Sequence, residues 1–335
     1  MVRLVIAISV IIGIITIIAS IVIINITSST ITTGVNENER LVVITSVAPI
    51  TNIVKNVGCD RINLVGIVPA GIDSHTFEPT PSDAIMIRNA DLVIINGLNL
   101  EISFERITEA ARIDRPNIQL LKLADNTITY EQWIFDFSFP KEKGDPNPHL
   151  WLNVAYVIRY VELIRDKLIE LDPVNADHYA SNADLYISKL SKLDTAIMES
   201  VQTIPPQNRK LLTYHDSWAY FAKRYGMTVI GAVQPSDFGE PTPQEVAKII
   251  EQIKKENVPA IFASEVFPSK VMEQIARETD VKIVETLADD VLPGKTGDIN
   301  HTYIGMMVEN MRNMIIPLGG NIDVLQEIDV RDVCA

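Results

Sequence analysis

Short segments rich in valine and isoleucine alternate with segments of helical periodicity from residue 41 onward. Strands are predicted at 41–46, 62–68, 91–97, 209–215, 227–233, 259–265 and 281–286. Helices are predicted between them, at 48–58, 81–90, 216–226, 242–257 and 268–280. Strands that are apolar along their whole length and are separated by helices are typical of parallel sheets covered on both faces. The alternation therefore predicts an α/β fold.

The middle of the chain departs from this alternation. Residues 152–171 have a helical pattern that Pro173 ends, and residues 175–204 contain neither glycine nor proline. As one α-helix, this second stretch of about 30 residues would be about 45 Å long. We therefore interpret this stretch as a rigid connection between two lobes and not as a flexible linker. The predicted organisation is an N-terminal lobe, a connecting helix and a C-terminal lobe, at 41–173, 174–206 and 207–335.

The chain begins with an apolar segment, Leu4 to Ile24, which at roughly 20 residues is long enough to cross a bilayer as a helix. The apolar part of a cleaved secretory signal is usually shorter, about 7–15 residues. We therefore interpret residues 1–25 as an uncleaved transmembrane anchor, with a cleaved signal as the alternative. Arg3 favours a cytoplasmic amino terminus, which would place the rest of the chain outside. Residues 26–40 are polar and are predicted to form a tether.

The charge balance and the absence of some catalytic motifs exclude several classes of protein. The net charge is −14, and an acidic chain is a poor partner for nucleic acid, because binding requires neutralisation of phosphates. The GKT sequence at 294–296 lacks the earlier glycine of a phosphate-binding loop, since Asp289 stands at that position. The GxSxG and HExxH motifs of hydrolases do not occur in the sequence. We therefore expect neither nucleic-acid binding nor ATP hydrolysis.

The two cysteines, Cys59 and Cys334, lie far apart in the sequence and form no CxxC pair. Thiolate zinc fingers and dithiol redox motifs therefore lack their residues. The two cysteines could form one disulfide. Cys334 lies in a C-terminal tail that we expect to be loose, which argues against pairing without excluding it.

Three of the five histidines stand in unusual contexts for an α/β chain. His75 lies in a turn-rich loop after the strand 62–68. His215 ends the strand 209–215, and His149 immediately precedes a helix. In open α/β sheets, ligands bind at the carboxyl ends of the strands. Taken one at a time, each histidine also fits an ordinary loop or capping role.

The carboxylate that would complete a metal site is Asp289 or Asp290, directly after the strand 281–286. Two or three imidazoles with a carboxylate suit Zn²⁺, Mn²⁺ or Fe²⁺. Either aspartate could instead cap a turn or a helix. The remaining histidines, His178 and His301, lie in helical patterns and are interpreted as surface residues. Local sequence alone makes a metal site a reasonable hypothesis and no more.

Five segments resemble one known family in the order in which they occur. The most specific is GIDSHTFEPTPSDAIMIRNADLVIINGLNLE at 71–101, which contains His75. The others lie at 147–154, 211–227, 262–284 and 288–311. Together they resemble the metal-binding solute proteins of ABC importers, a group that includes zinc-uptake and manganese-uptake proteins and streptococcal adhesin lipoproteins. The resemblance spans about residues 42–318.

The resemblance implies a fold and a set of ligands. The family has two α/β lobes joined by one long helix, and the metal lies between the lobes with two ligands from each. Matched residue by residue, the metal ligands would be His75, His149, His215 and Asp290. The family's last ligand is an aspartate followed by one residue and a leucine. Asp290 has that spacing to Leu292, so we prefer it to Asp289.

The resemblance also implies a function. The chain would be a monomeric receptor without enzymatic activity that captures a divalent metal outside the membrane and delivers it to an ABC permease with a separate ATPase. We expect Zn²⁺, with Mn²⁺ or Fe²⁺ as alternatives, because three imidazoles and one carboxylate form a borderline-soft set. Residues 126–148 contain no histidine, unlike the loop of many zinc-dedicated members, which weakens the case for a zinc-only protein. The apolar N-terminal segment would replace the lipidated cysteine that usually anchors the family.

Two other functions stay open. One is a metallohydrolase that uses the same three histidines, and a catalytic zinc site of this kind keeps an open position for water. The other is an adhesin or extracellular scaffold that contains a structural metal. Four protein ligands would argue against the hydrolase, because no position would be left for an activated water.

Several neighbouring residues are predicted to support the ligands. Asp73 and Glu78 could orient His75 by accepting its other ring N–H. Glu265 could do the same for His215. The tryptophans close in sequence to two of the ligands are predicted to wall the site and exclude water, with plain core packing as the alternative. They are Trp151 and Trp218.

Overall fold

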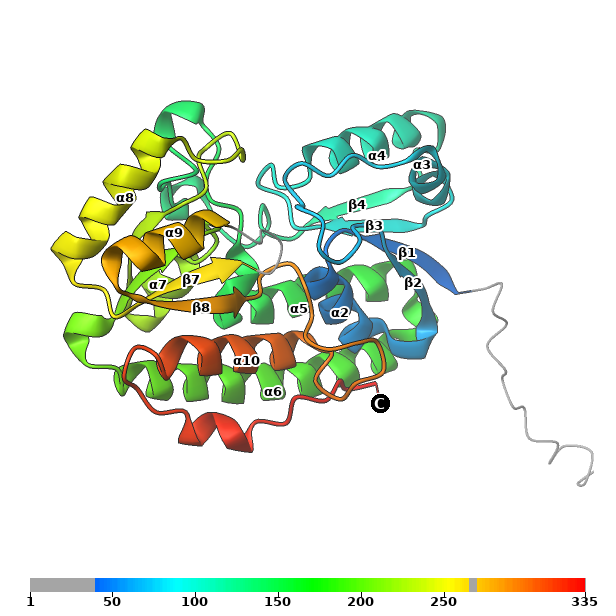
Figure 1. Ribbon diagram of the computed structural model, residues 1–335. Helices are drawn as coiled ribbons and strands as arrows, with labels where there is room; N and C mark the ends of the chain where they lie inside the picture. Colours follow the sequence, from blue (N-terminus) through cyan, green and yellow to red (C-terminus); the bar gives the residue numbers. More distant parts are fainter. Residues whose placement is uncertain (1–39, 265–269, 335) are drawn as a thin grey trace, which may run out of the picture. The chain divides into compact units, whose positions relative to one another are not determined.

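The computed structural model describes residues 40–264 and 270–334, and its N-terminal lobe is built on a four-stranded parallel sheet (Figure 1). The strands are β1 (Leu41–Thr45), β2 (Ile62–Gly66), β3 (Leu92–Ile95) and β4 (Gln119–Lys122). They lie in the order β2-β1-β3-β4. The connecting helices are α2 (Ala48–Gly58), α3 (Pro81–Arg88) and α4 (Ile102–Asp114). Each connection is therefore a strand–helix–strand crossover, as parallel pairing requires.

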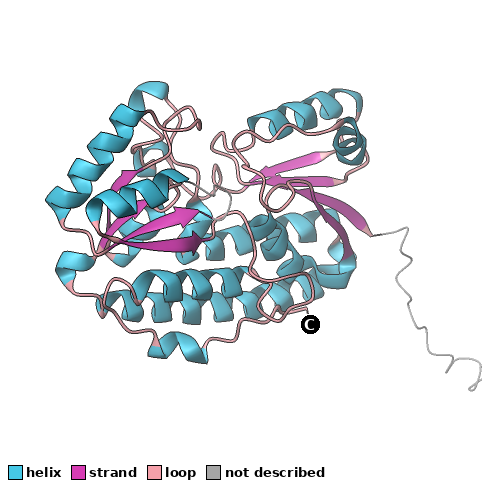
Figure 2. Cartoon of the chain, in the orientation of Figure 1, coloured by secondary structure: helices cyan, strands magenta, loops and turns pink. Residues whose placement is uncertain are grey.

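The C-terminal lobe repeats this arrangement. Its strands are β5 (Lys210–Thr213), β6 (Thr228–Ala232), β7 (Ala260–Ser264) and β8 (Lys282–Leu287), in the order β6-β5-β7-β8. Its helices are α7 (Ala219–Tyr225), α8 (Pro243–Glu256) and α9 (Lys270–Thr279). Figure 2 shows the strands of the two sheets in magenta, with helices around each. The predicted fold of two parallel-sheet α/β lobes is confirmed.

Three further helices pack together beside both sheets: α5 (Val154–Leu171), α6 (Ala176–Gln202) and α10 (Tyr303–Ile315). With 27 residues, α6 is about 40 Å long and contacts α2 and α5 as well as α7 and α10. Its buried face includes Tyr186 and Leu193, which share one apolar core with Leu92 of β3 and Phe262 of β7. The long connecting helix is thus observed, slightly shorter than predicted. The predicted lobe boundaries stay a prediction.

Two helices begin with the same local signal. Thr80 precedes Pro81 in α3, and Thr242 precedes Pro243 in α8. In each case the threonine hydroxyl accepts a hydrogen bond from the backbone N–H three residues later. The acidic side chain at that later position accepts one from the backbone N–H of the threonine. Proline suits the first helical turn because it needs no donor there. These capping boxes explain why both helices start where the sequence pattern places them.

The strand β4 and the helices α4 and α10 were not predicted from the sequence. The strand β4 has only four residues and only Leu121 among them is buried, so it lacks a strong strand pattern. Among residues 40–264 and 270–334, no helix is long and apolar enough to cross a membrane. The predicted anchor at 1–25 and most of the tether at 26–40 lie outside the described residues, as does Glu265.

The C-terminal tail is attached to α2, and the expectation of a loose tail is wrong. Cys334 forms a disulfide with Cys59, with the two Cα atoms 5.5 Å apart. The carboxylate of Asp332 accepts hydrogen bonds from the side chains of Asn52, Lys55 and Asn56 at 3.0, 2.7 and 2.8 Å. These contacts join segments that are more than 270 residues apart, so the local sequence carries no sign of them.

Candidate metal centre

The three histidines singled out by the sequence converge on one point. One ring nitrogen from each histidine lies within 4.8 Å of those from the other two. The Nε2 atom of His75 is 3.2 Å from that of His149 and 3.4 Å from that of His215. Nitrogen ligands about 2.0–2.1 Å from one Zn²⁺ at tetrahedral corners lie roughly 3.3 Å apart. The spacing of these nitrogens therefore fits a single small cation.

The loops that deliver the histidines come from both lobes. His75 follows β2 of the N-terminal lobe, and His149 lies before α5, within the range predicted for that lobe. His215 follows β5 in the C-terminal lobe, where the hydroxyl of Thr213 donates to the His215 carbonyl at 2.7 Å. Two of the three thus lie beyond the carboxyl ends of parallel strands, as predicted from the sequence.

Asn147 fixes the ring of His149. Its Oδ1 accepts from the His149 backbone N–H at 3.1 Å and lies 2.8 Å from Nδ1 of the same residue. An amide oxygen only accepts, so Nδ1 carries the proton and Nε2 presents a lone pair to the centre. Asn147 is itself held, because its Nδ2 donates to Asp136 and to the carbonyl of Asp216. His149 is fully buried, so its ring has one defined orientation.

Asp289 plays the same part for His215. Its Oδ2 lies 2.6 Å from Nδ1 of His215, and both side chains are buried. The carbonyl of Asp289 accepts from Nε1 of Trp151 at 2.8 Å, which fixes the backbone of this segment. The ring of Trp151 also packs against His149, with centroids 5.1 Å apart. Asp289 therefore engages the nitrogen of His215 that faces away from His75.

Asp290 reaches the loop that carries His75. Its Oδ2 accepts from the hydroxyl of Ser74 at 2.7 Å, although the two residues are 216 positions apart in the sequence. Both side chains are buried. The neighbouring aspartates therefore have different partners: Asp289 is bonded to His215, and Asp290 is bonded to the residue before His75.

Burial and neighbouring charges lower the pKa of two site residues and raise the pKa of two others. Burial lowers the pKa of His75 and His149 well below the ordinary value, and the charge of His215 lowers both further. Burial also opposes the charged form of His215, but the charge and hydrogen bond of Asp289 outweigh it and raise the pKa to about 9. Burial, and then the charge of Asp289, raise the pKa of Asp290 to about 7. Without a cation, the positive charge of the site resides on His215.

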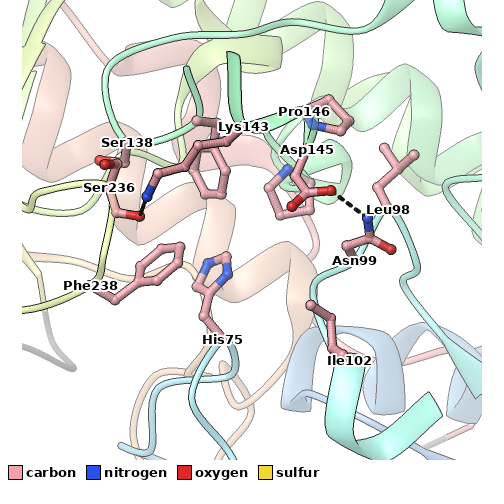
Figure 3. A pocket seen from close by; sticks show the side chains of 12 residues that line it. His75, Leu98, Asn99, Ile102, Ser138, Lys143, Asp145, Pro146, Ser236 and Phe238 are labelled. Carbon is pink, nitrogen blue, oxygen red and sulfur yellow. Dashed lines mark hydrogen bonds between the residues drawn. The ribbon is translucent and has the colours of Figure 1, made fainter. Parts of the chain in front are cut away.

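The site opens to solvent beside His75, the least buried of the three histidines. A cavity of about 190 Å³ lies there, bordered by residues of both lobes (Figure 3). The ring of Phe238 stacks on the ring of His75, with centroids 4.4 Å apart and planes inclined by 14°. Phe139 lies against both rings, at centroid distances of 5.5 and 5.8 Å. Aromatic side chains thus border the exposed side of the histidine cluster.

Some predicted supporting residues have other roles. Asp73 accepts from the backbone N–H of His75 at 2.9 Å and therefore stabilises the turn. Glu78 accepts from Ser103 on the exposed surface. Trp151 packs against a site histidine as predicted, whereas Trp218 packs against Phe221 in the core. The other two histidines lie outside the cluster: His178 is near Asp60, and Nδ1 of His301 is 3.0 Å from the carbonyl of Pro293.

Glu101 is a buried support that sequence reasoning missed. Its carboxylate accepts from the hydroxyl of Ser46 and from the backbone N–H groups of Asn96 and Gly97. Asn96 in turn donates to the carbonyl of Pro148, the residue before His149, at 2.8 Å. Burial raises the pKa of Glu101 to about 7. This network fixes the end of β3 against the segment that delivers His149.

The sequence matches the family described as the periplasmic component A of the zinc-uptake complex, over residues 43–315. This chain belongs to that family. The predicted resemblance is thereby confirmed, and the family match includes His75, His149, His215 and Asp290 within its range.

Individual relatives align with most of this chain. The manganese-binding lipoprotein MntA of Halalkalibacterium halodurans is 30 % identical over 285 residues, which are 84 % of this chain and 90 % of that protein. The manganese ABC transporter substrate-binding lipoprotein PsaA of Streptococcus pneumoniae is 28 % identical over 288 residues, which are 84 % and 90 % of the two chains.

Solved structures agree with the family assignment. The periplasmic zinc-binding protein TroA of Treponema pallidum has a TM-score of 0.75 at 26 % identity and covers 83 % of this chain and 99 % of its own. The manganese-bound periplasmic metal-binding protein of Candidatus Liberibacter asiaticus has a TM-score of 0.73 at 25 % identity, with coverages of 83 % and 100 %. Its cadmium-bound form is similar to the same extent. The fold of two α/β lobes is therefore the family's fold.

Proposed function

We propose that this protein captures a divalent transition metal outside the cytoplasmic membrane and delivers it to an ABC permease driven by a separate ATPase. The observation that carries the proposal is the convergence of three Nε2 atoms from two lobes at the spacing of ligands on one small cation. Membership of a family whose members include ABC transporter substrate-binding proteins supports the transport role.

The proposed ligands are His75, His149, His215 and Asp290. The preference for Asp290 is supported by the bond between Asp289 and the outer nitrogen of His215, which gives Asp289 an orienting role. A position of Asp290 beside the histidines is supported by its place after β8 and by its bond to Ser74, the residue before His75. The metal would then have two ligands from each lobe.

The proposed cargo is Zn²⁺, with Mn²⁺ and Fe²⁺ as alternatives. Three imidazoles and one carboxylate suit the borderline-soft Zn²⁺, whereas Mn²⁺ prefers more oxygen ligands. The names of the relatives support both metals: TroA is called zinc-binding, and MntA is called manganese-binding. A competition titration of Zn²⁺ against Mn²⁺ at this site therefore tests which of the two the protein binds more tightly.

We place the protein at the outer face of the cytoplasmic membrane, as a monomer without enzymatic activity. The lipoprotein and periplasmic names of its relatives support the location, and the apolar segment at 1–25 supports attachment through the N-terminus. Four protein ligands would leave no position for an activated water, which opposes a metallohydrolase. An adhesin or scaffold with a structural metal would predict unfolding when the metal is removed.

Metal titration of the full-length protein in detergent tests this function. We expect one Zn²⁺ per chain, removable by a chelator without loss of the circular dichroism of the folded protein. His75→Ala, His149→Ala and His215→Ala should each weaken binding by more than about a hundredfold, since loss of an orienting neighbour alone typically costs 10–100-fold.

The matched control is His178→Ala, because this histidine lies near Asp60 and outside the cluster. Unchanged metal binding in the three cluster variants would contradict the proposed site. An exchangeable water on the bound metal that persists together with hydrolysis of esters or peptides would instead favour the metallohydrolase.

A further inference from the structure

The histidine cluster is enclosed on one side and exposed on the other. His149 and His215 are buried, whereas His75 borders the cavity of about 190 Å³ shown in Figure 3. Any cation or water that reaches the cluster from this cavity must pass the ring of His75. The group that covers this ring therefore controls what else can approach the metal.

Phe238 is that group. Its ring lies nearly parallel to the His75 ring, at a centroid distance of 4.4 Å. The ring of Phe139 contacts both of these rings. Phe238 belongs to the loop between β6 and α8 of the C-terminal lobe, whereas His75 follows β2 of the N-terminal lobe. The stack therefore joins the two lobes at the mouth of the site.

The backbone of Phe238 has an unusual conformation, with a φ of +59°. A bulky side chain disfavours this left-handed region, and residues held in it are concentrated at functional sites. The loop is held by the segment that carries Phe139, where Ser138 donates to the carbonyl of Gln234 and Lys143 donates to that of Ser236, at 2.7 and 2.5 Å. These bonds set the loop so that the ring of Phe238 faces His75.

An apolar ring in this place has a definite chemical consequence. It offers no lone pair to a metal, and it occupies space through which water would reach the cluster. Zn²⁺ is satisfied by four ligands, whereas Mn²⁺ favours octahedral coordination by oxygen. We propose that Phe238 is a specificity-determining residue, a removable cap that excludes water from the metal and so favours Zn²⁺ over Mn²⁺. This inference rests on the proposed metal-capturing function.

The test compares Phe238→Ala and Phe238→Leu with the native full-length protein by competitive titration of Zn²⁺ against Mn²⁺. The ratio of Zn²⁺ to Mn²⁺ affinity should fall by roughly tenfold or more in Phe238→Ala. It should fall less in Phe238→Leu, which keeps an apolar side chain without a flat ring. Water-proton relaxation by bound Mn²⁺ should increase in Phe238→Ala, because water gains access to the ion, and chelators should remove Zn²⁺ faster.

The matched control is Ile102→Ala, which enlarges the same cavity from the opposite wall (Figure 3). The control should leave the affinity ratio unchanged. If Phe238→Ala and Phe238→Leu both keep the native ratio and the native water relaxation, the inference is wrong. Should Phe238→Ala fail to fold, Phe238→Leu decides. Failure of the proposed function would look different, since the native protein would then show no site-specific binding, or His75→Ala would bind the metal as tightly as the native protein.

Discussion

The two sides of the metal site are built on different physical principles. On the inner side, His149 and His215 are buried, and each is oriented by a polar partner that occupies its outer nitrogen: Asn147 for one and Asp289 for the other. On the outer side, His75 has a half-buried ring whose neighbour is the flat face of Phe238. Hydrogen bonds set the inner side, and aromatic packing covers the outer side.

Because of this difference, the inner side should determine the affinity for the metal, and the outer side should determine how water and metal reach the site. Hydrogen bonds to a ligand's second nitrogen fix its tautomer and direction before the metal arrives, so the inner side is preorganised. A stacked ring can move away without breaking a hydrogen bond, so the outer side can open. We therefore expect changes on the inner side to alter equilibrium binding most, and changes on the outer side to alter exchange and selectivity.

The largest effect should come from the inner ligands themselves. His215→Ala removes a ligand and leaves the buried carboxylate of Asp289 without its imidazole partner, so Zn²⁺ affinity should fall by more than about a hundredfold. The loss in His75→Ala should also exceed about a hundredfold but should be smaller than that in His215→Ala, because water from the cavity can enter the vacated position. Isothermal titration of the two variants measures the difference, and an equal or larger loss for His75→Ala would contradict the asymmetry between the two sides.

The next effect tests the orienting partner rather than the ligand. Asn147→Ala frees the ring of His149 and should weaken Zn²⁺ binding by about 10–100-fold. Asp73→Ala is the matched control, because Asp73 bonds to the backbone of His75 and not to its ring. It should change affinity much less. Competition against a chromophoric chelator gives both values, and similar losses in the two variants would show that the loop, and not the ring orientation, matters.

The histidine positions could be predicted because they are tied to local sequence. His75 and His215 follow predicted strands, and the family resemblance supplied the pairing with His149. Asn147 could have been recognised too, since it stands two residues before His149 and asparagine commonly bonds to the backbone two residues on. Phe238 could not, because its stack on His75 depends on how two distant loops meet.

The same distinction applies to the fold. The strands of both sheets are apolar runs, and most were predicted within a few residues, whereas β4 is short and half-exposed and was missed. The attachment of the tail to α2 was also missed, because it depends on contacts such as that of Asp332 with Asn52. Local periodicity predicts elements; contacts between distant segments need the folded chain.

Protonation of His215, on the inner side, should change Zn²⁺ affinity gradually with pH and by less than the substitutions above. The pKa of His215 is raised to about 9 by Asp289, so without metal this ring is protonated at pH 8, and a metal must displace that proton. Zn²⁺ affinity should therefore rise with pH up to about 9, by up to roughly tenfold per pH unit. Asp289→Asn keeps an oxygen acceptor but removes the charge, so the slope should flatten. Calorimetry in buffers of different ionisation enthalpy counts the protons released.

The smallest effect on metal binding is expected at the C-terminal tail, although its effect on stability should be large. Cys334→Ser removes a cross-link between distant segments and should lower the free energy of unfolding by about 2–5 kcal/mol. A chain of bonds does connect α2 to the site: Asn52 accepts from the Tyr303 N–H, Tyr303 donates to the Trp151 carbonyl, and Trp151 donates to that of Asp289.

Asn52 keeps its place in this chain without the disulfide, because α2 is packed in the core through Ile50 and Ile53. Zn²⁺ affinity of Cys334→Ser should therefore stay within about threefold of the native value, less than the roughly tenfold that one broken bond of 1.4 kcal/mol would produce. Denaturation and titration on the same sample measure both quantities. A loss of affinity that parallels the loss of stability would mean that the tail, as well as Asn147 and Asp289, sets the inner side of the site.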